Sequence, residues 1–151
     1  MSDRKYNGGE WTEARWKAFI ISTARGGMRR YPPKWQALKD AGIGKKVNKY
    51  SGRMAEHYIC SGCGNFFIAK DVQIDHTDPV VDPATGFVNW DTYFDRLYCE
   101  VENLQVLCRS CHNVKTQAER KERTIAKMHK VSDGEAATPD VKRRKKAGGS
   151  K

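Results

Sequence analysis

The chain has 151 residues, enough for one moderate hydrophobic core, so we expect one folded domain with polar tails. At 38% hydrophobic and 30% charged residues it has the composition of a soluble protein, and no apolar run approaches the roughly 20 residues of a membrane span. The N-terminus lacks the apolar segment of a secretory signal, so we expect a cytoplasmic protein whose five cysteines stay reduced.

The net charge of +10 is distributed unevenly along the chain. Residues 1–58 carry thirteen basic and five acidic side chains, and residues 109–131 carry seven and two, whereas residues 59–108 carry two and eight. An acidic middle between basic segments suits a site that attracts a cation inside a surface that attracts a polyanion. Ordinary solvated charge is the alternative, but the pattern favours a nucleic-acid partner.

The first half of the chain predicts one helix and little other regular structure. Residues 1–10 have no pattern and are expected to be disordered. Residues 11–27 have a helical apolar pattern, with Thr12 as a candidate N-cap and Gly26-Gly27 as a stop signal. Its apolar surface is wide, so we expect this helix to pack against another element.

Two prolines and several glycines follow. The segment 28–35 contains Pro32-Pro33 and is expected to run extended, and residues 38–53 form a basic connector interrupted by glycines. In the segment around the prolines, basic residues alternate with aromatic ones, a pattern that suits contacts with a phosphate backbone but equally a solvated face over buried tryptophans. The basic residues proposed to contact nucleic acid there are Arg29, Arg30 and Lys34.

The second half predicts short strands and two helices. Residues 57–77 suggest two short strands around a cysteine turn and a third strand over 72–75. Residues 90–100 suggest a short helix, and residues 102–130 begin extended and become a long helix. His57 and His129 fit no motif and are expected at the surface. The last twenty residues, 132–151, are basic and poor in apolar side chains, so a disordered tail is expected.

Two C-x-x-C pairs, Cys60/Cys63 and Cys108/Cys111, are the strongest local signal. Each spacing lets two thiolates converge from one tight turn, and two such turns complete a tetrahedral structural Zn²⁺ site. A redox pair is less favoured, because one pair would suffice and no βαβ pattern surrounds it. The 44 residues between the pairs exceed ordinary zinc-ribbon spacing, so a functional segment is inserted there. The fifth cysteine, Cys99, is interpreted as a small buried hydrophobe.

The inserted segment carries Asp75-His76 where the third strand should end, and His112 follows the second cysteine pair directly. If zinc brings the two pairs together, a carboxylate and an imidazole meet beside each other, which suits a divalent metal with open positions. Asp78, before Pro79, is either an acidic residue that supports this site from behind its ligands or the start of a turn with Pro79, and we favour the turn.

These blocks together resemble the HNH endonuclease family in its four-cysteine, zinc-stabilised form. The chain is similar to free-standing HNH nucleases of tailed bacteriophages, more loosely so in its N-terminal part. The similarity covers roughly residues 56–121. The positions that carry it are Cys60, Cys63, Asp75, His76, Pro79, Asn103, Cys108, Cys111, His112, Lys115 and Thr116.

The resemblance implies an α+β protein with a ββα-metal nuclease fold. In that fold Asp75 and His112 hold a catalytic Mg²⁺ or another divalent metal, His76 is the general base, and Asn103 fixes the loop that carries His76. A basic residue such as Arg109 or Lys115 is expected to help hold the phosphate. The implied organisation is a basic helical, DNA-contacting extension over 1–55, a nuclease domain over 56–131 and the tail over 132–151.

The implied activity is metal-dependent hydrolysis of double-stranded DNA by a monomer or dimer, in a homing or packaging role that can involve a phage partner protein. In a phage-encoded protein, the location is the cytoplasm of the host cell. Two alternatives stay open: a restriction or repair nuclease of a cellular host, and a zinc-stabilised DNA-binding module without catalysis. An intact set of Asp75, His76, Asn103 and His112 argues against the second, because a binding module has no need of them together.

Overall fold

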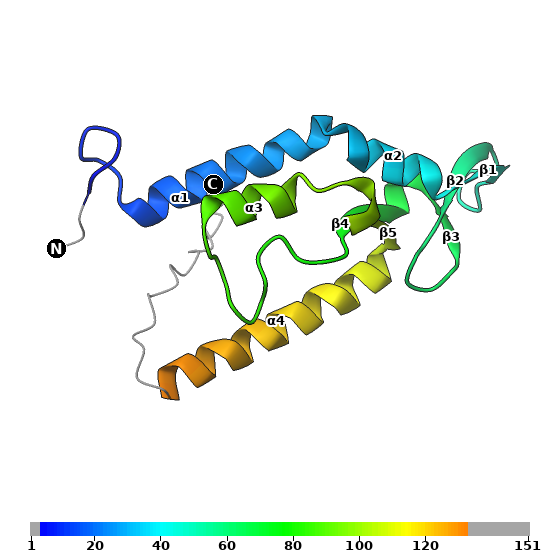
Figure 1. The fold of residues 1–151 in the computed structure, drawn as a ribbon. Coiled ribbons are helices and arrows are strands. Elements are labelled where there is room, and N and C mark those ends of the chain that lie inside the picture. Colours follow the sequence, from blue (N-terminus) through cyan, green and yellow to red (C-terminus); the bar gives the residue numbers. More distant parts are fainter. Residues whose placement is uncertain (1–3, 133–151) are drawn as a thin grey trace, which may run out of the picture.

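The computed structural model describes residues 4–132, which fold into helices and two small sheets of a mixed α+β protein (Figure 1). The first helix, α1 (Glu13–Gly27), begins where the sequence predicted, because the Thr12 hydroxyl accepts a hydrogen bond from the Arg15 N–H at 3.3 Å. Before it, Tyr6 forms an antiparallel bridge with Trp11, so at least residues 6–11 have a defined turn rather than the expected disorder.

The expectation of an extended segment at the two prolines is wrong. After a short 3-10 helix, η1 (Met28–Arg30), the chain forms helix α2 (Pro32–Asp40). Pro32 and Pro33 occupy the first two helical positions, where no intrahelical partner exists for an N–H group and the fixed φ of proline suits a helix.

The basic connector is also more ordered than expected. It contains strand β1 (Gly42–Val47), which pairs antiparallel with β2 (Met54–Ile59), and β2 pairs antiparallel with β3 (Phe66–Ile68). The two short strands around the cysteine turn are therefore confirmed, and a third strand joins them from the N-terminal side. The predicted boundary between residues 55 and 56 falls within β2.

The second sheet consists of β4 (Val72–His76) and β5 (Leu104–Cys108), which pair antiparallel. Their register sets Asp75 opposite Gln105 and His76 opposite Leu104. Helix α4 (Arg109–Ser132) starts directly after β5 and contacts both strands. The predicted polar residues Asp75, His76 and His112 therefore lie on an antiparallel strand pair and on the helix that follows it.

Helix α3 (Trp90–Leu97) lies in the connection between β4 and β5 and packs beside helix α1 (Figure 1). Its side chains Tyr93 and Leu97 are among the most buried of the molecule. Trp16 of α1 meets Trp90 edge-on at 5.7 Å between ring centroids, and the Tyr98 hydroxyl donates to the Ala24 carbonyl at 2.6 Å. The packing partner expected for the first helix is therefore α3.

The predicted tail over 132–151 lies, except for its first residue, outside the described residues. Of the helices that the structure describes, none combines the length and apolarity needed to cross a membrane.

Candidate metal centre and adjacent polar site

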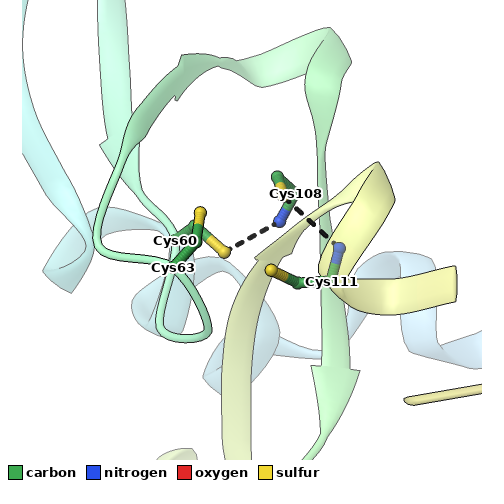
Figure 2. Close-up of side chains that lie close together, drawn as sticks. All are labelled: Cys60, Cys63, Cys108 and Cys111. Carbon is green, nitrogen blue, oxygen red and sulfur yellow. Dashed lines mark hydrogen bonds between the residues drawn. The ribbon is translucent and has the colours of Figure 1, made fainter. Parts of the chain in front are cut away.

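The four cysteines of the two C-x-x-C pairs converge at the junction of the two sheets (Figure 2). Cys60 follows β2, Cys63 lies in the next turn, Cys108 ends β5, and Cys111 lies in the first turn of α4. Their sulfur atoms all lie within 4.8 Å of one another. Four sulfur ligands from two tight turns are the donor set of a structural zinc site, so these residues are positioned to bind one metal ion.

Backbone geometry supports this arrangement. The Cys108 N–H donates to Cys60 Sγ at 3.2 Å, and the Cys111 N–H donates to Cys108 Sγ at 3.5 Å (Figure 2). Gly64 has a φ of +72°, a conformation that glycine adopts without strain and that closes the first turn. A Cβ on Gly62 would lie 2.9 Å from Cys111 Sγ, so the two turns approach too closely for a side chain at this position.

The protonation of the cysteines responds to the same contacts. Burial raises the pKa of Cys60, but hydrogen bonds from the backbone N–H groups of Cys108, Cys63 and Gly62 outweigh burial and lower its pKa to about 6. The hydrogen bond with the Cys108 side chain, followed by burial, raises the pKa of Cys111 to about 12. The cluster thus favours a thiolate at Cys60, and a bound metal would displace the remaining protons.

The cluster is also part of the core. Cys60 is fully buried and packs with Leu107 and Cys108, and Phe67 covers them from β3. The Ser61 N–H donates to the Val106 carbonyl at 2.9 Å, which ties the first cysteine turn to β5. A metal at the four sulfurs would therefore join the two sheets and anchor the start of α4.

Asp75, on β4, lies against α4. Its Oδ2 atom is 2.9 Å from the Lys115 ammonium, which is also 2.6 Å from Glu119 Oε1. The ammonium is at ion-pair distance but lies outside hydrogen-bond geometry, so the buried Asp75 Oδ2 has no hydrogen-bond partner among the described residues. Desolvation lowers the pKa of Lys115, but its contacts with Glu119 and Asp75 outweigh desolvation and raise that pKa.

His112 is half-buried on α4, three residues before Lys115 and so on the same helix face. The Asp75–Lys115 contact therefore sets the Asp75 carboxylate against the face that carries His112. Within residues 4–132, the four cysteines are the only group of three or more candidate ligands that converge; Asp75, His76 and His112 do not form a second. A buried carboxylate oxygen without a hydrogen bond is nevertheless a chemically suitable ligand for a divalent cation.

His76, the last residue of β4, is oriented by helix α3. Its Nε2 lies 2.9 Å from the Leu97 carbonyl oxygen. A carbonyl only accepts, so Nε2 carries the proton in the neutral ring and Nδ1 keeps its lone pair. No described residue hydrogen-bonds Nδ1. The arrangement leaves one ring nitrogen able to accept a proton.

Asn103 holds the chain immediately after His76. Its side-chain Oδ1 accepts from the Asp78 N–H at 2.9 Å, and its backbone carbonyl accepts from the Thr77 N–H, also at 2.9 Å. These bonds tie the loop after β4 to the start of β5. Asp78 itself is exposed and uses its backbone here, as expected for a turn residue.

The residues predicted to contact nucleic acid lie in two places. Arg29 and Arg30 are exposed in η1, and Lys34 lies over the Trp35 ring at 5.4 Å. Arg109 is exposed at the start of α4 and donates to the Lys70 carbonyl at 2.8 Å. Lys115 is instead engaged with Asp75 and Glu119. Sequence reasoning missed the role of Glu119, although its position four residues after Lys115 is the spacing of a helical ion pair.

Comparison with known proteins adds no relative: no family model, no curated protein and no solved structure matches the chain. The function of the chain is therefore inferred from its own residues and their contacts.

Proposed function

We propose that the protein is a divalent-metal-dependent DNA endonuclease of the HNH type, stabilised by zinc at the four cysteines. The observation that carries the proposal is the contact between Asp75 and Lys115, because it sets the carboxylate against the helix face of His112. The Nε2 atom of the neighbouring His76 faces the Leu97 carbonyl, which leaves Nδ1 as the acceptor of the neutral ring, and Asn103 holds the loop that follows His76.

In this proposal Asp75 and His112 hold the catalytic cation, Mg²⁺ or another divalent ion. When bound, that ion supplies Lewis-acid stabilisation of the charge on the scissile phosphate. His76 Nδ1 takes a proton from a water molecule as the water oxygen bonds phosphorus, and the bond to the leaving sugar oxygen breaks, with that oxygen taking a proton from solvent. The hydrogen bond to Leu97 keeps the imidazole oriented for this transfer.

The charge distribution supports DNA as the substrate. The acidic segment 59–108 contains Asp75 and His76, whereas the segments before and after it carry the excess of basic residues. A polyanion is attracted to the flanks and a cation to the centre. The resemblance to free-standing phage HNH nucleases supports a homing or packaging role in the cytoplasm of a host cell, alone or with a phage partner protein.

One observation favours a second candidate, a zinc-stabilised DNA-binding module without catalysis. The Lys115 ammonium already neutralises Asp75 and lies where a cation bound to Oδ2 would sit. If this ion pair persists when Mg²⁺ is present, no catalytic metal binds and the protein only holds DNA.

A plasmid-cleavage assay separates the two candidates. Zinc-loaded protein is incubated with supercoiled plasmid without added metal, with Mg²⁺ and with Mn²⁺, alongside His76→Ala and a control, His129→Ala, at an exposed histidine near the end of α4. We expect metal-dependent nicking or linearisation that falls about 10²- to 10⁴-fold in His76→Ala. The control should cut like the wild type, and both variants should retain DNA binding. DNA binding without cutting by the wild type would support the binding module.

A further inference from the structure

One face of the β1–β2–β3 sheet contains a hollow of about 130 Å³ between the sheet and the β1–β2 turn. His57 lies in it and, contrary to the surface position expected, is buried, with its Nδ1 2.8 Å from the Ala55 carbonyl oxygen. The hollow is lined by Val47, Asn48, Lys49, Tyr50, His57, Phe66, Phe67, Ile68 and Asp71.

Two aromatic side chains at this hollow are largely exposed. Tyr50, in the turn, is 63% exposed, and Phe66, on β3, is 51% exposed. The Phe66 ring also meets the buried His57 ring edge-on, at 6.0 Å between centroids. Exposed aromatic faces beside a hollow can take up a flat ring by stacking.

Three lysines surround these rings. Lys46 lies 4.3 Å from the centroid of Phe66, while Lys49 and Lys70 lie 5.0 Å and 4.7 Å from the centroid of Tyr50. Within residues 4–132, none of the three forms an ion pair with a carboxylate. Asp71 is the one acidic residue lining the hollow. The three lysine ammonium groups therefore contact aromatic rings rather than carboxylates, and they are available to bind an anion.

The lysines are continuous with the start of α4. The Arg109 guanidinium donates to the backbone carbonyl of Lys70 at 2.8 Å. Arg109 is the first residue of the helix that carries His112. A chain of basic residues therefore leads from the hollow to the beginning of that helix.

We propose that this face binds an unpaired stretch of a nucleic-acid strand, with phosphates on Lys46, Lys49 and Lys70 and a base stacked on Tyr50 at the hollow. Phosphate contacts replace the exposed cation–π contacts of the lysines, because charge-assisted hydrogen bonds to phosphate are stronger. An unpaired strand fits better than a duplex, since only unstacked bases can use an exposed aromatic face. Binding here needs no catalysis, so the inference goes beyond the proposed function.

The test measures binding of full-length, zinc-loaded protein to a fluorescein-labelled 20-nucleotide single strand and to a duplex of equal length, by anisotropy without added Mg²⁺. We expect Tyr50→Ala to weaken single-strand binding about tenfold with little effect on the duplex, and Tyr50→Phe to bind like the wild type. Replacing Lys46, Lys49 and Lys70 with alanine should reduce the salt dependence of single-strand binding by about two in log–log slope. The charge-matched control replaces Lys121, Lys127 and Lys130, which lie in the second half of α4.

Either of two results overturns the inference. One is unchanged single-strand binding by Tyr50→Ala. The other is equal weakening by the sheet and control triple variants, which would show attraction by overall charge alone. Zinc content and melting temperature verify that each variant is folded. Tyr50-dependent binding by a protein that never cuts plasmid would leave this inference standing while removing the proposed nuclease activity.

Discussion

The ammonium of Lys115 lies 2.9 Å from Oδ2 of Asp75, an oxygen that is buried and accepts no hydrogen bond among the described residues. In the proposed nuclease, the Lys115 ammonium thus occupies the position beside Asp75 Oδ2 where the divalent cation would bind. Whether the ammonium competes with a metal can be measured directly.

Replacing Lys115 with Met removes the cation and keeps most of the aliphatic volume. Without added metal, we expect a loss of about 1 kcal/mol in unfolding free energy, small because both side chains are partly exposed. With the competitor gone, Mn²⁺ should bind more tightly and raise the melting temperature more than in the wild type. Calorimetric titration with Mn²⁺ measures this, after zinc loading.

Asp75→Asn is the matched control for that experiment, since it removes the charge of the other partner. It should lose the Mn²⁺-dependent stabilisation altogether. If Lys115→Met gains no metal affinity, the ammonium does not compete with the metal. If Asp75→Asn still binds Mn²⁺ as well as the wild type, Asp75 is not a ligand of the proposed catalytic metal.

Asn103→Ala tests the loop after His76. The Asp78 N–H loses its side-chain acceptor, so we expect a loss of about 1 kcal/mol in stability and a fall in plasmid cleavage of at least tenfold, because the loop that follows His76 loses one of its two hydrogen bonds to Asn103. Asn89→Ala removes a similar bond at the start of α3, in which the Thr92 N–H donates to Asn89 Oδ1 at 2.8 Å. This control should lose similar stability and keep its cleavage rate. Equal cleavage by both variants would contradict the positioning role of Asn103.

Local patterns in the sequence identified much of this fold. The Thr12 cap, the cysteine spacing and the alternation before Asp75 each depend on residues close together in the chain, and the structure has α1, the cysteine cluster and β4 where they predicted them. The convergence of the two cysteine pairs, which are separated by 44 residues, could be predicted because a structural zinc ion takes four ligands and each pair supplies only two.

The features that sequence reasoning missed depend on tertiary context. Pro32-Pro33 can interrupt a helix or begin one, and the preceding residues do not decide between these outcomes. Strand β1 is exposed throughout, and its two glycines and two lysines leave no apolar alternation to mark it, so only its pairing with β2 makes it a strand. The contact of Lys115 with Asp75 joins residues forty positions apart, and no spacing rule predicts such a pair.

Cys108→Ser tests the metal centre. Three sulfurs and a hydroxyl bind zinc poorly, and structural zinc contributes folding free energy, so we expect loss of bound zinc and of the cooperative melting transition. Zinc analysis and thermal melting measure both. Cys99→Ser is the control, because Cys99 is partly buried and outside the cluster, and it should keep one zinc per chain. Full zinc content in Cys108→Ser would contradict the four-cysteine site.

Alanine substitutions at the neighbouring residues Gly27 and Gly26 test whether α1 packs against Tyr98. A Cβ on Gly27 would collide with the Tyr98 hydroxyl, which donates to the Ala24 carbonyl at 2.6 Å, whereas a Cβ on Gly26 meets nothing within 4 Å. We expect Gly27→Ala to lower the unfolding free energy by about 1–3 kcal/mol through overpacking. Gly26→Ala should raise it by up to about 1 kcal/mol, because alanine favours the helix. Urea unfolding measures both, and equal effects would show that α1 does not pack on Tyr98 in solution.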